Sequence, residues 1–114
     1  MSSLGSSTWE RSRIEVAEEK LFEEKVKKHL RERGAWVLKT WSGGFQRSGV
    51  PDLLICYKGR FIAIELKAEK GKVSDLQRRE LELIREAGGL GFVLRPSHFS
   101  DFSVMLDSID KGTL

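Results

Sequence analysis

Three charged side chains interrupt residues 49–72, which otherwise form two apolar strands around a tight turn. Asp52 lies in the first strand, and Glu65 and Lys67 lie in the second. Alternate side chains of a strand share a face, so Glu65 and Lys67 point the same way. If Lys58 and Gly59 form a two-residue turn, counting outward places Asp52 directly opposite Glu65. The same register pairs three further sets of residues, Tyr57 with Arg60, Cys56 with Phe61 and Leu54 with Ala63.

Two carboxylates in directly opposed positions, with β-carbons roughly 4.5–5.5 Å apart, repel each other. In a partly buried site, this repulsion raises one pKa or requires a cation. Mg²⁺ meets that requirement, because it binds one or two carboxylates together with water and substrate phosphate oxygens. The Lys67 ammonium reaches the same place, where it can orient a water molecule or stabilise charge on a phosphate. A solvated face with an ordinary Glu–Lys pair is the alternative, but all three residues beside apolar strands favour a hydrolytic metal site.

The rest of the composition excludes several other kinds of site. The 114 residues include one cysteine, Cys56, and two histidines, His29 and His98, which excludes an intrachain disulfide and a zinc site made of cysteines. Cys56 lies in an apolar strand, so we expect a buried structural thiol. The glycine-rich stretches SGG and AGGLG match neither a P-loop nor a dinucleotide fingerprint, so no nucleotide cofactor is expected. No apolar run approaches the roughly 20 residues that span a bilayer, so no membrane partner is expected.

The elements that must position these side chains follow from apolar periodicity and turn signals. Apolar residues at helical spacing predict a first helix over residues 14–33, and Ser74 opens a second helix over residues 74–87. Strands are predicted over residues 35–40, 51–57, 60–68 and 90–95, a loop over 41–49, and a last helix over about 99–109. This order, α-β-β-β-α-β-α, indicates an α/β or α+β class built on one mixed sheet. We assign residues 1–12 to a flexible lead and residues 13–114 to a single domain.

The first helix carries further carboxylates. On a helical wheel of about 100° per residue, Glu19 and Glu23 border the face that carries Phe22 and Val26, whereas Glu24 points the opposite way. Glu19 and Glu23 are therefore candidates to add a carboxylate to the site. The alternative is an ordinary acidic helix start that complements the helix dipole.

The residues of the hairpin resemble a known family. Pro51-Asp52, followed by Glu65-Leu66-Lys67, matches the PD…(D/E)xK signature of restriction-endonuclease-like nucleases. The wider stretches SGVPDLLI, GRFIAIELKAEKGKVSDLQ and AGGLGFV are similar to the VRR-NUC (virus-type replication–repair nuclease) family, over roughly residues 14–95. The resemblance implies a restriction-endonuclease-like α/β core, a mixed sheet flanked by helices.

The resemblance also implies a role for each matching residue. Asp52, Glu65 and the backbone carbonyl of Leu66 would bind Mg²⁺, for which Mn²⁺ would substitute, and Lys67 would position or activate the attacking water. Gln77 matches a glutamine that supports the active site in this family. It also ends a Ser74-x-x-Gln77 capping box, and both interpretations can hold together.

Families of this type often add an acidic residue from the first helix. The spacing of Glu23 ahead of Val26, Leu30 and Gly34 resembles the helix of related resolvases. We therefore choose Glu23 as a further metal ligand, directly or through a water, with Glu19 as the second choice.

The function implied by the resemblance is a metal-dependent DNA endonuclease, a phosphodiester hydrolase that is structure-selective on branched DNA. A Holliday-junction resolvase acting as a homodimer in phage-type replication, recombination or repair fits this description, in the cytoplasm of a phage-infected or bacterial cell. The net charge of +3 permits a nucleic-acid partner. The alternatives are a sequence-specific restriction-type endonuclease and a non-catalytic DNA-binding module on the same fold. DNA contacts, mainly to phosphates, are expected from Arg47, Lys70, Lys72 and Lys39, with Trp41 and Phe45 able to approach distorted DNA.

Overall fold

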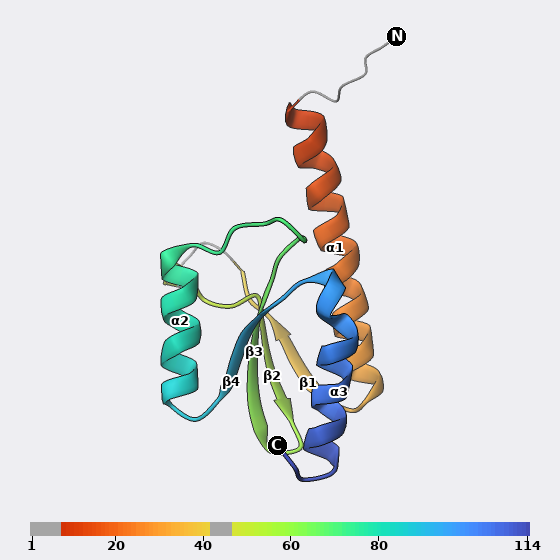
Figure 1. Ribbon diagram of the computed structural model, residues 1–114, viewed down its shortest axis with the longest axis vertical. Coiled ribbons are helices and arrows are strands. Elements are labelled where there is room, and N and C mark those ends of the chain that lie inside the picture. The colour runs from red at the N-terminus through yellow and green to blue at the C-terminus, as the bar shows by residue number, and fades with distance from the viewer. Residues whose placement is uncertain (1–7, 42–46) are drawn as a thin grey trace.

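The computed structural model describes residues 8–41 and 47–114, which form an α/β domain with the expected order of elements (Figure 1). In chain order the elements are α1 (Thr8–Glu32), β1 (Trp36–Lys39), β2 (Leu53–Tyr57), β3 (Arg60–Leu66), α2 (Asp75–Glu86), β4 (Leu90–Leu94), a 3₁₀ turn η1 (Pro96–His98) and α3 (Phe99–Asp110). The predicted order α-β-β-β-α-β-α is therefore confirmed, and the 3₁₀ turn is the one addition among the described residues.

The described strands form one mixed sheet in the order β1-β2-β3-β4. β2 pairs antiparallel with β1 and β3, whereas β4 runs parallel to β3 and is reached through α2, as a parallel connection requires. The β2–β3 turn has positive φ at Lys58 (51°) and Gly59 (82°), the conformation of a two-residue hairpin turn. The predicted register is confirmed from Tyr57↔Arg60 through Leu54↔Ala63, and one residue beyond Leu53↔Ile64 it places Asp52 across from Glu65.

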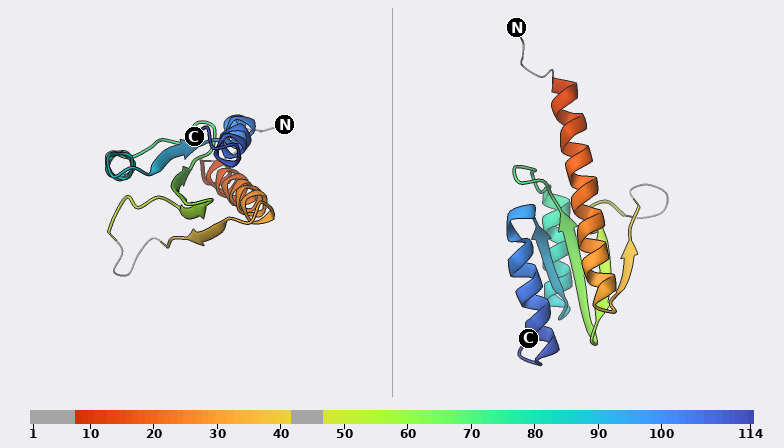
Figure 2. Two further views of the ribbon diagram at one scale, coloured as in Figure 1. Left: turned by 90° about the horizontal axis from the view of Figure 1, so that it is seen from below. Right: turned by 90° about the vertical axis from the view of Figure 1, so that its right-hand side faces the viewer.

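The two faces of the sheet are covered by different helices. α1 and α3 lie side by side on one face, and α2 lies on the other (Figures 1 and 2). The core between the sheet and the first pair of helices contains Phe22, Val26 and Leu30 of α1, Phe102, Leu106 and Ile109 of α3, and the facing side chains Leu53, Ile55, Tyr57, Ile62, Ile64, Leu66 and Leu94 of the strands. The last helix therefore packs on the core.

The second face is covered only in part. α2 packs over β4 and β3, and the neighbouring surface of β1 and β2 is left exposed, with Trp36 58% and Leu38 46% accessible to solvent. We call the surface formed by Trp36, Leu38, Cys56 and Phe61 the open face. The expectation of a buried Cys56 is wrong, because Cys56 alternates with the core residues Ile55 and Tyr57 and is exposed on this face.

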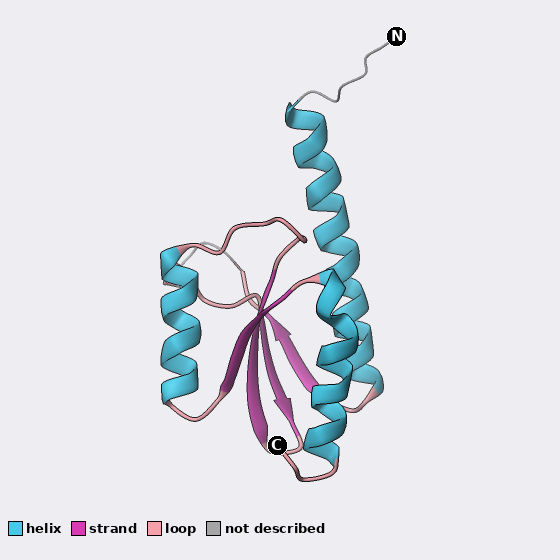
Figure 3. Cartoon of the chain, in the orientation of Figure 1, coloured by secondary structure: helices cyan, strands magenta, loops and turns pink. Residues whose placement is uncertain are grey.

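Helix α1 begins at Thr8, six residues before the predicted start at residue 14. Residues 8–18 are all exposed, and this half of the helix extends beyond the rest of the domain (Figures 2 and 3). The sequence of this half has no apolar residues that contribute to the core. Local contacts stabilise it instead, such as Arg13 over the ring of Trp9, 4.8 Å from the centroid. The remainder of the predicted lead, residues 1–7, lies outside the described residues. Within the described ranges, no helix is long and apolar enough to cross a membrane.

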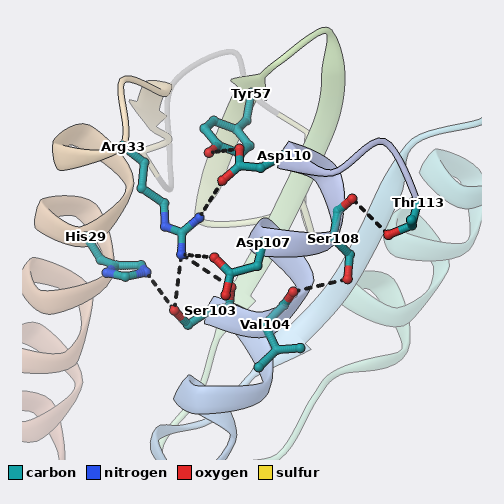
Figure 4. Close-up of polar contacts among 9 residues, drawn as sticks. All are labelled: His29, Arg33, Tyr57, Ser103, Val104, Asp107, Ser108, Asp110 and Thr113. Atoms are coloured by element: carbon teal, nitrogen blue, oxygen red, sulfur yellow. Dashed lines mark hydrogen bonds and ion pairs between the residues drawn. The ribbon is translucent and has the colours of Figure 1, made fainter.

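A polar network fastens α3 to α1 and to the end of β2 (Figure 4). Arg33, directly after α1, donates to Asp107 Oδ1 at 2.6 Å and to Asp110 Oδ2 at 3.2 Å. Tyr57 of β2 also donates to Asp110. Since α1 lines the candidate site described below, this network sets the position of one wall of that site.

Candidate active site

Asp52 is positioned by a glycine turn and by the start of α2. Gly49 has φ of 88°, and a β-carbon there would come within 2.6 Å of the Leu76 backbone. Only glycine fits this approach. The neighbouring Thr40 donates its backbone N–H to the Asp52 carbonyl at 2.8 Å and its hydroxyl to the Pro51 carbonyl at 2.7 Å. The segment before β2 is therefore held on both sides, which fixes the position of the Asp52 backbone.

The Asp52 carboxylate bridges the hairpin. Its Oδ2 accepts the backbone N–H of Leu66 at 2.9 Å, so one oxygen is used to hold it against β3. Its Oδ1 faces the Lys39 ammonium at 3.9 Å. Asp52 is half-buried, and its Oδ1 is the oxygen available to a ligand.

Glu65 is the buried carboxylate of the site, with only 2% of its surface exposed. Its Oε2 accepts from Gln77 Nε2 at 2.9 Å and lies 3.6 Å from Lys67 Nζ. Its Oε1 is buried with no hydrogen-bond partner among the described residues. Burial, followed by the charge of Asp52, raises the pKa of Glu65 to about 8, against the attraction of Lys67. A buried carboxylate oxygen without a donor is costly, and a bound cation would satisfy it.

Gln77 contacts both Ser74 and Glu65. Its Oε1 accepts the backbone N–H of Ser74 at 2.9 Å, and its own N–H donates to Ser74 Oγ at 3.1 Å. This reciprocal pair is the capping box at the start of α2. The cap fixes the side chain so that its Nε2 is left to donate to Glu65. The helix start thus orients a site residue.

The carboxylates of α1 approach the same place from the opposite face of the sheet. Glu23 accepts from Lys39 Nζ at 2.7 Å and lies 3.1 Å from Lys27 Nζ. Burial raises the pKa of Glu23, but the hydrogen bonds from Lys39 and Lys27 outweigh burial, and its pKa lies below the usual range. Glu24 is the exposed member of the group, with 58% of its side chain accessible.

Two cavities that share Glu19 lie beside the site; Asp52 lines one of them, and the buried Glu65 lines neither. The Asp52 cavity, of about 570 Å³, is lined by Glu23, Lys39, Trp41, Asp52 and Leu66 among others. The Lys67 cavity, of about 400 Å³, is lined by Phe22, Lys25, Lys67 and Ala68 among others. Glu19 borders both cavities, and Glu23 borders only the first. The structure therefore brings both helix candidates to the site.

The donor set fits a hard divalent cation. Asp52 Oδ1 and the unpartnered Glu65 Oε1 are carboxylate oxygens, the ligands that Mg²⁺ prefers, and Leu66 lines the Asp52 cavity. No group of three acidic, histidine or cysteine side chains forms a ready metal site in the parts of the chain that are described. Two carboxylates with a carbonyl would leave further positions for water and phosphate oxygens.

The predicted DNA-binding residues are divided between the site and the surface. Lys39 and Trp41 line the Asp52 cavity. Arg47 is 73% exposed and donates to Glu80 of α2 at 2.8 Å. Lys70 and Lys72 are exposed in the loop after β3, and neither lines the two cavities. Phe45 lies outside the described residues.

One supporting residue, Arg95, was not predicted. Its Nη1 donates to the carbonyls of Ala68 at 2.7 Å, Glu69 at 3.1 Å and Gly71 at 2.8 Å. These three carbonyls belong to the loop that begins at Lys67, so Arg95 fixes the backbone next to Lys67. No spacing in the sequence connects Arg95 with this loop.

Comparison with known proteins identifies the family of this fold. The model of the VRR-NUC domain matches residues 6–97. A solved structure described as a VRR_NUC domain has 29% sequence identity and a TM-score of 0.64, covering 76% of this chain and 94% of that chain. A comparison with curated protein sequences found no match. The matched region contains both carboxylates, Lys67 and Gln77, and it ends before α3.

Proposed function

The chain belongs to the VRR-NUC family of nuclease domains, and we propose that it is a metal-dependent DNA endonuclease. The observation that carries the proposal is the pair of facing carboxylates, one of which is buried with an unpartnered oxygen. A purely structural hairpin would gain nothing from a carboxylate whose pKa is raised to about 8. Bound Mg²⁺, or Mn²⁺ in its place, would satisfy Glu65 Oε1 and offset the repulsion between the two negative charges.

The bound metal would polarise a phosphodiester and lower the pKa of a water molecule. Asp52 and Glu65 would hold it, together with the Leu66 carbonyl. Lys67, 3.6 Å from Glu65 Oε2, would orient the attacking water, and Gln77 would keep Glu65 in place. In hydrolysis, a water oxygen forms a bond to phosphorus while the bond to the leaving oxygen breaks. The water loses a proton to solvent, and the leaving oxygen keeps the electron pair and takes up a proton.

We propose Glu23 as an acidic residue that serves the site from α1, with Glu19 as the second choice. Both border the Asp52 cavity. Glu23 is held ionised by Lys27 and Lys39, so it reaches a metal through water more readily than directly. Arg47, Lys70 and Lys72, all exposed, are proposed to contact DNA phosphates outside the two cavities.

Branched DNA as the substrate and a homodimer as the active form complete the proposal. One small domain presents one site, and a two-fold dimer would place two sites on a symmetric four-way junction. The open face supports an interface, because Trp36, Leu38 and Phe61 leave an apolar surface that no described element covers.

The test is cleavage of a labelled four-way junction beside matched flap, duplex and single-stranded DNA, with Mg²⁺, with Mn²⁺ and with EDTA. Lys67→Ala is compared with Lys28→Ala, an exposed lysine of α1 that serves as the matched control. Paired symmetric cuts that need metal and Lys67 are expected. Cutting of duplex or flaps instead would remove the preference for junctions, and binding without cutting on every substrate would contradict the nuclease.

The dimer is tested separately. The wild-type protein is expected to have twice the mass of the chain by light scattering, and Cys56 on the open face is expected to react more slowly with a thiol reagent as the protein concentration rises. A monomer at every concentration, with Cys56 equally reactive throughout, would contradict the dimer without affecting the nuclease.

A further inference from the structure

Lys39 is a second lysine beside the candidate site. Its Nζ lies 3.9 Å from Asp52 Oδ1, the oxygen of Asp52 that the hairpin leaves available. It also donates to Glu23 Oε1 at 2.7 Å. Its side chain is 31% exposed, so the ammonium is held by carboxylates and still reaches the cavity.

The topology puts the two lysines on either side of Asp52. Lys39 is the last residue of β1, Asp52 immediately precedes β2, and Lys67 immediately follows β3. Since both neighbours of β2 run antiparallel to it, these three residues meet at one edge of the sheet. Neighbouring strands are about 4.8 Å apart, so the two lysine-bearing strands are separated by roughly twice that distance. Lys39 is level with Ile64 through Leu53, so Lys67 also lies three residues, or roughly 10 Å, further along the sheet, which leaves room for a phosphodiester between the two ammonium groups.

The surroundings of the two lysines also differ. Lys67 lines one cavity and is paired with Glu65, whereas Lys39 lines the other and is paired with Glu23 and Asp52. In an in-line displacement the attacking and leaving oxygens lie on opposite sides of phosphorus. A site with Lys67 beside the water therefore places Lys39 beside the other oxygen.

We propose that Lys39 is a catalytic residue that stabilises the leaving oxygen of the phosphodiester, with Glu23 holding its ammonium in position. The proposal rests on the nuclease function proposed above. As the bond between phosphorus and the leaving oxygen breaks, the electron pair stays on that oxygen. The Lys39 ammonium donates a hydrogen bond to it, and solvent supplies the proton that completes the hydroxyl. The ammonium keeps its own proton throughout, so its effect is electrostatic.

The test uses single-turnover cleavage of two versions of one DNA. The wild-type protein first identifies the cut site and the end groups, which show which oxygen leaves. A second DNA then carries sulfur in place of that bridging oxygen. A thiolate is a much better leaving group and needs little stabilisation. Lys39→Met is expected to slow cleavage of ordinary DNA by about 10²-fold or more, and to lie within about tenfold of the wild type on the sulfur-bridged DNA.

Lys67→Met provides the contrast and Lys28→Met the control. Lys67→Met is expected to be defective on both DNAs, because the water side is unchanged by the sulfur, and Lys28→Met is expected to match the wild type on both. Binding of uncut DNA in EDTA, followed by anisotropy, is expected to weaken by less than about fivefold for Lys39→Met, the loss of one phosphate contact. If circular dichroism shows that Lys39→Met is misfolded, Lys39→Arg serves as the second variant. Lys39→Arg is expected to retain more activity than a folded Lys39→Gln.

Equal defects of the Lys39 variants on both DNAs, or no defect on ordinary DNA, would overturn this assignment while the nuclease stands. Failure of the wild type to cut any DNA would overturn the nuclease, and the assignment of Lys39 with it.

Discussion

Replacing Glu65 with glutamine is expected to stabilise the metal-free protein at alkaline pH. Glu65 is 2% exposed, and its folded pKa of about 8 compares with an ordinary value of 4.5. At 1.36 kcal/mol per pKa unit, ionising it in the folded protein costs up to about 5 kcal/mol. Glutamine avoids this cost, which already includes the attraction of Lys67, and keeps an oxygen to accept from Gln77, but its buried amide nitrogen brings donors that need partners. We therefore expect a net gain of roughly 2–4 kcal/mol in the free energy of unfolding above pH 8.

The sign of the pH dependence follows from the raised pKa. Between about pH 4.5 and pH 8 the folded protein holds the Glu65 proton that the unfolded chain has released, so wild-type stability falls as the pH rises through this interval. Glu65→Gln removes that fall. The two proteins are expected to differ by less than about 1 kcal/mol at pH 5 and by the full amount at pH 8.5.

The assay is urea unfolding in EDTA at pH 5.0, 6.5 and 8.5, with circular dichroism and thermal melts as a second measure. A gain of roughly 3 kcal/mol corresponds to about 12 °C in Tm for a domain of this size. Glu86→Gln, at an exposed position of α2, is the matched control and is expected to show no comparable pH-dependent gain. The reasoning is refuted if Glu65→Gln is less stable than the wild type at pH 8.5, or if its gain is the same at pH 5.0.

Three further predictions follow from other contacts. Gln77→Ala removes both the reciprocal cap with Ser74 and the donor to Glu65. It is expected to lower the free energy of unfolding in urea by about 1–2 kcal/mol and to slow single-turnover cleavage. A loss of stability with unchanged cleavage would limit the role of Gln77 to the cap. Gly49→Ala, with φ of 88° and the Leu76 backbone 2.6 Å from the added β-carbon, is expected to cost at least about 1–2 kcal/mol, and an unchanged unfolding midpoint would contradict the close approach. Arg33→Met is expected to lower the free energy of unfolding by about 1–2 kcal/mol, since the aspartate partners of Arg33 are partly exposed. The difference from the wild type should shrink in 1 M NaCl. A difference insensitive to salt would indicate lost packing instead.

The hairpin register could be predicted because it depends on local rules. A two-residue turn at Lys58 and Gly59 together with strict alternation determines every pair as far as Leu53↔Ile64. The position of Asp52 across from Glu65 then needs no knowledge of the rest of the fold. The capping box of Ser74 and Gln77 is local in the same way.

Features that depend on distant contacts could not be predicted. The error on Cys56 arose because an apolar strand indicates burial without indicating which of its faces is covered. Only the placement of α2 over β3 and β4 shows that the β1–β2 part of that face is open. The partners of Arg33 lie more than 70 residues away, and no pattern near Arg33 indicates them.

The position of Glu65 follows from the local register of the hairpin, whereas its contacts depend on distant parts of the chain. Its strand neighbours Ile64 and Leu66 are core residues, and an apolar residue at position 65 would lie as readily between β2 and β4 without an unpartnered oxygen. The local rule of strand burial is therefore broken at Glu65, beside Asp52 and Lys67. The cap of α2 holds Glu65 through Gln77, the glycine turn positions Asp52, and Arg95 holds the loop that begins at Lys67. Three separate devices that hold Glu65, Asp52 and Lys67 in place are hard to explain by stability, because deleting the costly charge of Glu65 would serve stability better. They are explained if the carboxylate must be ready, in a fixed position, for a cation and a phosphate.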